Sequence, residues 1–225
     1  TRLGYKSAHD LASSYPSFFY NFVYSHVSES LAYLADTDSG RKWTSQLYSN
    51  VFSQEHRAIL SNDGFELLSR IPKILKSNEL NASLEQILAE VCEYQGWPVG
   101  HIYEVNTKGK TLVPSAIWFF NNKKKGTKAF QDITMKTSFK IGQGLPGRVW
   151  KEKKPIWVED VTIDKNFPRA KHAKDVGVRG ALAFPVYTSK DLKYVFEIYS
   201  LKPEVPDAQA LEMMAQIGYD ISREF

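Results

Sequence analysis

The side chains best suited to catalysis or metal binding are sparse in this sequence. It has one cysteine, Cys92, and five histidines that stand singly. One cysteine cannot form a disulfide within the chain, and a lone cysteine in a helical apolar pattern is usually a buried small hydrophobe. No set of His, Cys and carboxylate residues has metal-ligand spacing, and no local motif suggests a Ser, His and Asp triad. The sequence therefore predicts neither catalytic nor metal-binding residues.

A glycine-rich stretch at residues 142–147, Gly-Gln-Gly-Leu-Pro-Gly, could be a tight turn or a cradle for phosphate. Its glycines permit backbone angles that other residues rarely adopt. A P-loop would end in Gly-Lys-Ser or Gly-Lys-Thr, which is missing here. We therefore expect a turn, followed by a short helix over residues 145–151 with Pro146 in its first turn.

Three tryptophans, Trp118, Trp150 and Trp157, carry large rings with one N–H each. We expect most of these rings to lie in the core. Trp118 stands near a strand end beside a basic loop, which makes it the best candidate among them to face a ligand.

These residues must be positioned by a mixture of helices and strands. Apolar residues recur at helical spacing over residues 65–75, 84–92 and 206–225, where Asn81 or Ser83 could cap the second helix and Gly96 ends it. Alternating or apolar runs predict strands, and a further short helix is expected over residues 168–175. The predicted strands cover residues 99–105, 112–120, 139–141, 155–158, 181–187 and 194–201. This order predicts an α+β fold.

The composition limits the range of partners. The chain has 225 residues and a net charge of +4, and residues 106–154 hold twelve Lys or Arg but only two acids. Lysines spread over a loop usually form a solvated face, and no stacking or helix-turn-helix motif accompanies them, so we do not expect nucleic-acid binding. No apolar run is long enough to span a membrane, and no signal peptide is visible. With one cysteine, these features predict a cytoplasmic protein.

Residues 1–61 follow no sustained period and stay unassigned. The opening residues 3–11, Leu-Gly-Tyr-Lys-Ser-Ala-His-Asp-Leu, resemble a piece of a PAS domain that precedes a helix. The alternative is a helical cap on the following domain. Because Asn62-Asp63-Gly64 begins a new unit, we expect two regions, 1–61 and 62–225.

Three linked motifs resemble the GAF domains attached to bacterial sensor histidine kinases and diguanylate cyclases. They occur in the order and spacing of that family, and the resemblance covers about residues 65–225. The matching stretches are residues 96–103 with 112–118, residues 142–150 with 154–161, and residues 164–170 with Gly177 and 181–186.

The resemblance implies a central antiparallel sheet with the N- and C-terminal helices on one face and a ligand pocket on the other. It also implies a sensory module of a signal-transduction protein, such as a two-component system. We expect it to bind an unknown small molecule, form a homodimer through the terminal helices and signal to a downstream kinase or cyclase domain. The alternative is a dimerisation or protein-interaction module with a vestigial pocket.

In the family, the segment that covers the pocket corresponds to the one carrying Phe167, Arg169 and His172. Arg169 and His172 could meet an anion or a carboxylate, or lie on an exposed helix of ordinary polar residues. Glu197 stands between apolar neighbours and could point into the pocket or to solvent, and we expect solvent. With Trp118, these four residues are the candidate ligand contacts.

Several specialised members of the family are not matched. No cysteine lies between Phe167 and Gly177, so we do not expect a covalently attached bilin, and the cofactor is unknown. GAF-fold methionine sulfoxide reductases use several cysteines, and one cannot run their disulfide cycle. The Asn-Lys-x-Phe-Asp-Glu pattern of cyclic-nucleotide-binding members is also missing. No kinase or cyclase motif appears, so we expect the effector outside this sequence.

Overall fold

A computed structural model describes the second region of the chain. The residues that it describes are 62–106, 108, 110–121, 127–170, 173, 177–188 and 191–224. They belong to one compact unit, Asn62–Phe225. The expectations for residues 1–61, including the PAS-like segment, lie outside the described residues.

Two sixteen-residue helices begin this unit, α5 (Asn62–Ser77) and α6 (Leu80–Gln95). Pro72 lies inside α5 without interrupting it. The predicted cap of α6 at Asn81 or Ser83 is wrong, because the residue before the helix is Glu79 in an extended conformation. The Ser83 hydroxyl instead donates to the Ile74 carbonyl oxygen, 3.0 Å away. This buried bond fastens α6 to α5.

Five antiparallel strands form one sheet in the order β2-β1-β5-β4-β3. Their alternating and apolar runs had marked them, and the boundaries differ from prediction by a few residues at most ends. The strands are β1 (Val99–Asn106), β2 (Thr111–Phe120), β3 (Ile156–Val158), β4 (Ala181–Thr188) and β5 (Asp191–Tyr199). The stretch at 139–141 contributes only a single bridge, between Phe139 and Leu112, instead of the expected strand.

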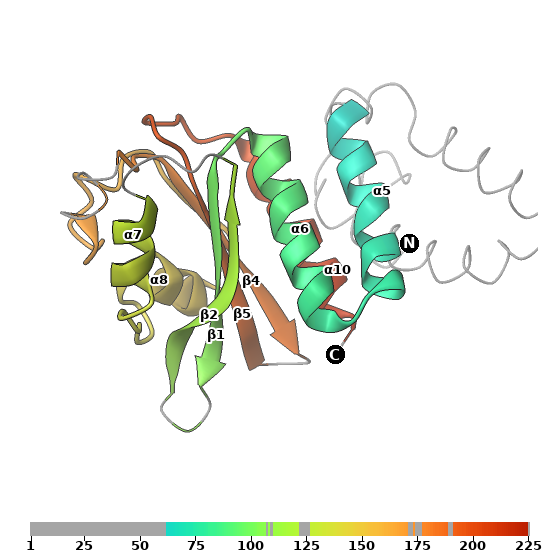
Figure 1. The fold of residues 1–225 in the computed structure, drawn as a ribbon, viewed down its shortest axis with the longest axis horizontal. Coiled ribbons are helices and arrows are strands. Elements are labelled where there is room, and N and C mark those ends of the chain that lie inside the picture. The colour runs from blue at the N-terminus through green and yellow to red at the C-terminus, as the bar shows by residue number, and fades with distance from the viewer. Residues whose placement is uncertain are drawn as a thin grey trace, which may run out of the picture. The chain divides into compact units, whose positions relative to one another are not determined.

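Helices cover both faces of the sheet (Figure 1). On one face lie α6 and α10 (Ala208–Ser222), with α5 packed against them, and on the other lie α7 (Thr127–Thr134) and α8 (Gly144–Glu152). The predicted α+β arrangement, with the N- and C-terminal helices on one face of the sheet, is confirmed. Helix α7 was not predicted, and α10 begins and ends inside the expected range 206–225.

The face toward α6 and α10 is apolar and closely packed. The rings of Phe184 and Phe196 stack with centroids 4.9 Å apart. A Cβ atom added to Gly218 of α10 would lie 2.3 Å from the Pro185 carbonyl oxygen, and one added to Gly100 would lie 2.6 Å from Cys92 Sγ. Both glycines therefore allow a helix to approach the sheet more closely than any side chain would permit.

Candidate functional site

On the face away from α6 and α10, three polar or aromatic side chains lie in a row across adjacent strands. His101 of β1 is opposite Trp118 of β2 on one side and opposite Glu197 of β5 on the other. Directly opposed residues point to the same face of a sheet, so the three side chains are neighbours. The His101 and Trp118 rings are 4.1 Å apart between centroids.

Arg169 places a guanidinium group against this row. It comes from the segment between β3 and β4 and makes two parallel bonds to the Glu197 carboxylate, 3.0 Å to Oε1 and 2.9 Å to Oε2. The same group donates to Thr134 Oγ1 at 3.0 Å and to the Tyr199 hydroxyl at 2.8 Å. Arg169 is 1% exposed and Glu197 is fully buried. We call these four residues, with His101, the Arg169–Glu197 centre.

Aromatic rings enclose the guanidinium. Five ring centroids lie between 5.0 and 5.8 Å from its central carbon. A cation at this distance over a ring face is attracted by the negative face of the π-system. The rings are those of Tyr103, Phe130, Phe139, Phe167 and Tyr199.

The buried pair stays ionised because each partner stabilises the charge of the other. Burial alone would raise the pKa of Glu197, but the charge and hydrogen bonds of Arg169 outweigh burial and lower it. Burial would lower the pKa of Arg169, but Glu197, Tyr199 and Tyr103 raise it by more than burial lowers it. Such a pair costs desolvation energy and is tolerated when its hydrogen bonds are satisfied.

His101 is the titratable neighbour of this pair. Its Nε2 lies 3.2 Å from the Ser115 carbonyl oxygen, which can only accept, so Nε2 carries a hydrogen. Its Nδ1 lies 3.3 Å from Glu197 Oε1, a contact that would favour a second proton. Burial opposes the charged ring more strongly and lowers the pKa of His101.

Three of the predicted ligand contacts meet at this centre, and a fourth lies beside it. Arg169 and Glu197 form its ion pair, Phe167 is one of its rings, and Trp118 touches it through His101. The buried Trp118 Nε1 has no hydrogen-bond partner among the described residues. His172 lies outside the described residues. Contact of these residues with a ligand stays a prediction.

Two expectations about orientation are settled by this geometry. Glu197 does not point to solvent, and that expectation was wrong because a cation from another segment makes its burial tolerable. Arg169 meets a carboxylate instead of lying on an exposed helix, and the carboxylate belongs to the chain itself.

Sequence reasoning missed three members of the Arg169–Glu197 centre, His101, Thr134 and Tyr199, and three further rings around the guanidinium, those of Tyr103, Phe130 and Phe139. The alternation of Val99, His101, Tyr103 and Val105 places His101 and Tyr103 on one face, and Tyr199 follows Glu197 by two residues. That period was a usable signal. Nothing in the local sequence marks Thr134, which reaches the centre because α7 packs over the sheet.

The glycine-rich stretch at residues 142–147 is a turn that runs directly into the first residues of α8. Its amides are already used, because Gly142 N donates to the Gly147 carbonyl at 2.7 Å and Gly144 N donates to Asn166 Oδ1 at 2.9 Å. Asn166 returns a bond to the Gly142 carbonyl, also at 2.9 Å. These pairings hold Asn166, in the segment before Arg169, against the glycine-rich turn, and they leave those two amides unavailable to a phosphate.

A second buried carboxyl group lies on the opposite side of the sheet, in α10. Asp220 accepts a bond from Gln216 Nε2 at 2.8 Å. Asp220 Oδ2 and Gln216 Oε1 are buried without a partner among the described residues. Burial raises the pKa of Asp220 to about 6, and the bond from Gln216 only partly opposes this.

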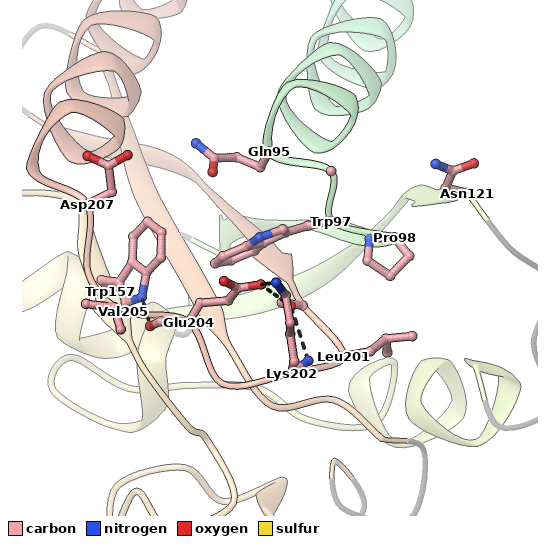
Figure 2. A pocket seen from close by; sticks show the side chains of 12 residues that line it. Gln95, Trp97, Pro98, Asn121, Trp157, Leu201, Lys202, Glu204, Val205 and Asp207 are labelled. Carbon is pink, nitrogen blue, oxygen red and sulfur yellow. Dashed lines mark hydrogen bonds and ion pairs between the residues drawn. The ribbon is translucent and has the colours of Figure 1, made fainter. Parts of the chain in front are cut away.

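A surface hollow of about 640 Å³ lies where α6 ends and the linker to α10 begins (Figure 2). Trp97 and Trp157 meet edge to face in it, with centroids 5.1 Å apart, and the Trp157 indole N–H donates to the Glu204 carbonyl at 2.7 Å. Gln95 Nε2, also in the lining, is buried without a partner in the described part of the chain. The hollow shares no lining residue with the Arg169–Glu197 centre.

Two other features, a metal-binding cluster and a membrane-spanning helix, are absent from the described residues. No group of three or more His, Cys, Asp or Glu side chains is placed to hold a metal ion among these residues. Nor is any described helix both long enough and apolar enough to cross a membrane.

Comparison with protein families gives two matches. A family model described as GAF domain matches residues 77–223, and one described as Npun_R2479-like matches residues 1–57. Protein NLP2 of Arabidopsis thaliana is 39% identical over 77 residues, which make up 31% of this chain and 8% of that protein. Protein NLP7 of the same plant is 48% identical over 46 residues, 20% of this chain and 5% of that protein. The chain thus matches less than a tenth of each plant relative.

Solved structures share the fold at low sequence identity. The free methionine-R-sulfoxide reductase of Neisseria meningitidis, in complex with its substrate, aligns with a TM-score of 0.58 and 17% identity, covering 72% of this chain and 87% of that one. The GAF domain of an Acinetobacter phosphoenolpyruvate-protein phosphotransferase aligns with a TM-score of 0.57 and 17% identity, covering 73% of this chain and 94% of that one. The GAF domain of A. aeolicus nlh2 aligns with 0.53 and 21%, covering 72% and 94%.

Proposed function

Because the chain belongs to the GAF domain family, we propose that residues 62–225 form a sensory module that binds a small molecule and passes the signal to an effector through the terminal helices. GAF domains are commonly sensory or regulatory modules. The observation that carries the proposal is the Arg169–Glu197 centre. It is a buried pair of opposite charges on the face that the terminal helices leave free, and one partner comes from the covering segment.

The ligand site in this proposal comprises Trp118, Phe167, Arg169 and Glu197, with His172 as a further contact. The Trp118 indole supports binding at this place, because its Nε1 is buried without a partner among the described residues. A buried polar atom without a partner costs free energy, and an acceptor on a ligand or a water would remove that cost.

The proposed relay runs through strand β5 to α10. Glu197 faces the centre, while its neighbour Phe196 faces the helices and stacks on Phe184. Phe184 in turn lies against Gly218 of α10. A ligand that binds two arrangements of this path with different affinities shifts their populations by that difference and no more.

The surroundings of the module are part of the proposal. We propose a homodimer in a bacterial cytoplasm whose effector is a histidine kinase or diguanylate cyclase, supported by the motif likeness to domains in such proteins. A regulatory role is favoured over an enzymatic one. Although a sulfoxide reductase shares the fold, Cys92 is fully buried on the helix side of the sheet, against Gly100 and away from the centre.

A second candidate function is a dimerisation or protein-interaction module whose pocket is vestigial. Arg169 favours it, because this side chain already satisfies Glu197 and fills the space among the aromatic rings. The two functions differ in a direct measurement. Native mass spectrometry of the purified protein, compared with its denatured mass, reveals a small molecule retained by the sensor or an empty dimer from the interaction module.

A ligand screen tests the sensory proposal at the level of single residues. Thermal unfolding is measured with a metabolite library for the native chain, for Glu197→Gln at the centre and for Trp157→Leu in the surface hollow. We expect a stabilising ligand whose effect is lost in Glu197→Gln and kept in Trp157→Leu, with altered hydrogen exchange in α10. The reverse loss would assign the ligand to the hollow. No stabilising ligand, together with an empty dimer, would replace the sensor by the interaction module.

A further inference from the structure

The side chain of Arg169 is bound mainly by groups that belong to other elements of the fold. Glu197 and Tyr199 belong to β5, Tyr103 to β1, and Thr134 to α7. Of the five rings, only that of Phe167 shares with Arg169 the segment between β3 and β4. Apart from Phe167, the groups that recognise the guanidinium therefore lie outside the segment that carries Arg169.

The geometry of these groups is specific for a flat, forked cation. The Glu197 carboxylate takes two parallel N–H bonds of 3.0 and 2.9 Å, the bidentate pattern that a guanidinium forms and a compact ammonium does not. Thr134 and Tyr199 provide further oxygen acceptors at 3.0 and 2.8 Å. Five aromatic rings surround the central carbon.

An anion is a poor alternative occupant of the same space. It would face the Glu197 carboxylate and the negative faces of the surrounding rings, and Arg169 would be its main attraction. A neutral ligand that displaced Arg169 would leave Glu197 fully buried and without its counter-ion, so the carboxylate would stay uncompensated or take up a proton, at a cost in free energy either way. Only a cation replaces what the Arg169 side chain supplies.

We propose that the small molecule sensed at this centre carries a guanidinium group, which replaces the Arg169 side chain among the aromatic rings and on Glu197. This inference rests on the proposed sensory function. Arg169 is then a tethered competitor: it closes the site when no ligand is present and turns outward when the ligand binds. The outward rotation of the Arg169 side chain is the primary structural change.

Competition predicts an unusual effect of removing Arg169. In the native chain the open site is only a fraction of the population, and the apparent affinity is reduced by that fraction. A tethered group also acts at a high effective concentration. Loss of the Arg169 side chain should therefore strengthen binding of a free guanidinium compound, whereas a ligand that pairs with Arg169 would lose affinity.

The test is isothermal titration calorimetry of the native chain, Arg169→Ala and Arg169→Lys with methylguanidinium and agmatine, using methylammonium and sodium chloride as controls. We expect Arg169→Ala to bind both guanidinium compounds at least about tenfold more tightly than the native chain. Arg169→Lys, which keeps a tethered cation, should not show this gain. Adding Glu197→Gln to Arg169→Ala should abolish binding. A folded Arg169→Ala that binds neither compound overturns the proposal.

The proposal can still be tested if Arg169→Ala folds poorly. In that case methylguanidinium at millimolar concentration should restore the thermal transition, and sodium chloride at equal ionic strength should not. Arg169→Gln, closer in volume to the native residue, is titrated in parallel, and absence of both rescue and binding overturns the proposal.

The native chain separates this inference from the proposed function. Its Arg169 Nε–H resonance should shift when agmatine is added. A screening ligand that lacks a guanidinium group and loses its effect in Glu197→Gln would overturn the ligand class and keep the sensor.

Discussion

Glu197 and Asp220 are both buried carboxyl groups, on opposite sides of the same sheet, and their environments differ in one respect. Glu197 has a cation and hydrogen bonds on both oxygens, while one oxygen of Asp220 has no partner among the described residues. The pKa of Glu197 is lowered despite its burial, whereas burial raises that of Asp220 to about 6. The comparison teaches that the partner, and not the depth of burial, decides whether a buried acid is charged.

The strongest way to break this contrast is to remove the partner of Glu197. Arg169→Ala should destabilise the protein by about 3–5 kcal/mol, because it leaves an uncompensated buried charge. Chemical denaturation at pH 7 measures the change. The matched control is Arg70→Ala, whose side chain is 43% exposed and pairs with Glu66 and Glu90, with an expected cost below about 1 kcal/mol.

A double substitution checks the reason. Arg169→Met with Glu197→Leu removes both charges and should recover most of the loss, since well-packed apolar residues often replace a buried ion pair without cost. Equal destabilisation by the single and double variants would show that packing of the arginine stem, and not its charge, is what matters.

The second effect should have the opposite sign. Asp220→Asn should stabilise the protein at pH 7 by up to about 3 kcal/mol, because one pKa unit corresponds to about 1.4 kcal/mol. The folded-state pKa of Asp220 lies above its ordinary value of 3.8. The stability of the native chain is therefore highest, as far as Asp220 is concerned, below pH 3.8, and this part of the stability is lost as the pH rises through about 6.

Unfolding curves between pH 4 and 8 measure this dependence. The native chain should lose stability between acid and neutral pH as Asp220 ionises, and Asp220→Asn should not show this loss. Asp132→Asn, at an exposed position of α7, is the control and should leave the dependence unchanged. A native-like dependence in Asp220→Asn would mean that Asp220 ionises normally.

The third prediction sharpens the contrast between the two faces by testing the apolar one. Gly218→Ala should destabilise by about 1–3 kcal/mol, since the new Cβ would lie 2.3 Å from the Pro185 carbonyl oxygen. Helix propensity alone predicts a gain of about 1 kcal/mol for the same change. Thermal unfolding distinguishes the two effects by the direction of the change in stability. A stabilised variant would show that α10 can move away from β4 at little cost.

The smallest effect concerns His101. Its pKa is lowered by burial, so below its ordinary value of 6.5 the unfolded chain takes up a proton that the folded chain resists, and stability falls as pH decreases. The slope stays below about 1.4 kcal/mol per pH unit. Measured in an Asp220→Asn background, His101→Asn should flatten this fall between pH 7 and 5. An unchanged slope would assign it to other groups.

Local sequence patterns were enough to predict the helices and strands of the fold. Apolar spacing marked α5, α6 and α10, alternation marked the strands, and three linked motifs indicated the GAF fold. These signals are local, because helix and strand periods follow from backbone geometry within a few residues. Helix α7 escaped this reading although its final residue, Thr134, supplies an acceptor to the centre.

The roles of the polar residues depend on contacts that form between distant segments when the chain folds. Arg169 and Glu197 are 28 residues apart, and neither local pattern shows that they meet, so Glu197 read as an exposed strand residue. The register of β2, β1 and β5 brings Trp118 and His101 beside them. An isolated charge in an apolar run can be buried only if a partner from another segment compensates the loss of its hydration. That interaction forms only when the chain folds, so the local sequence does not show it.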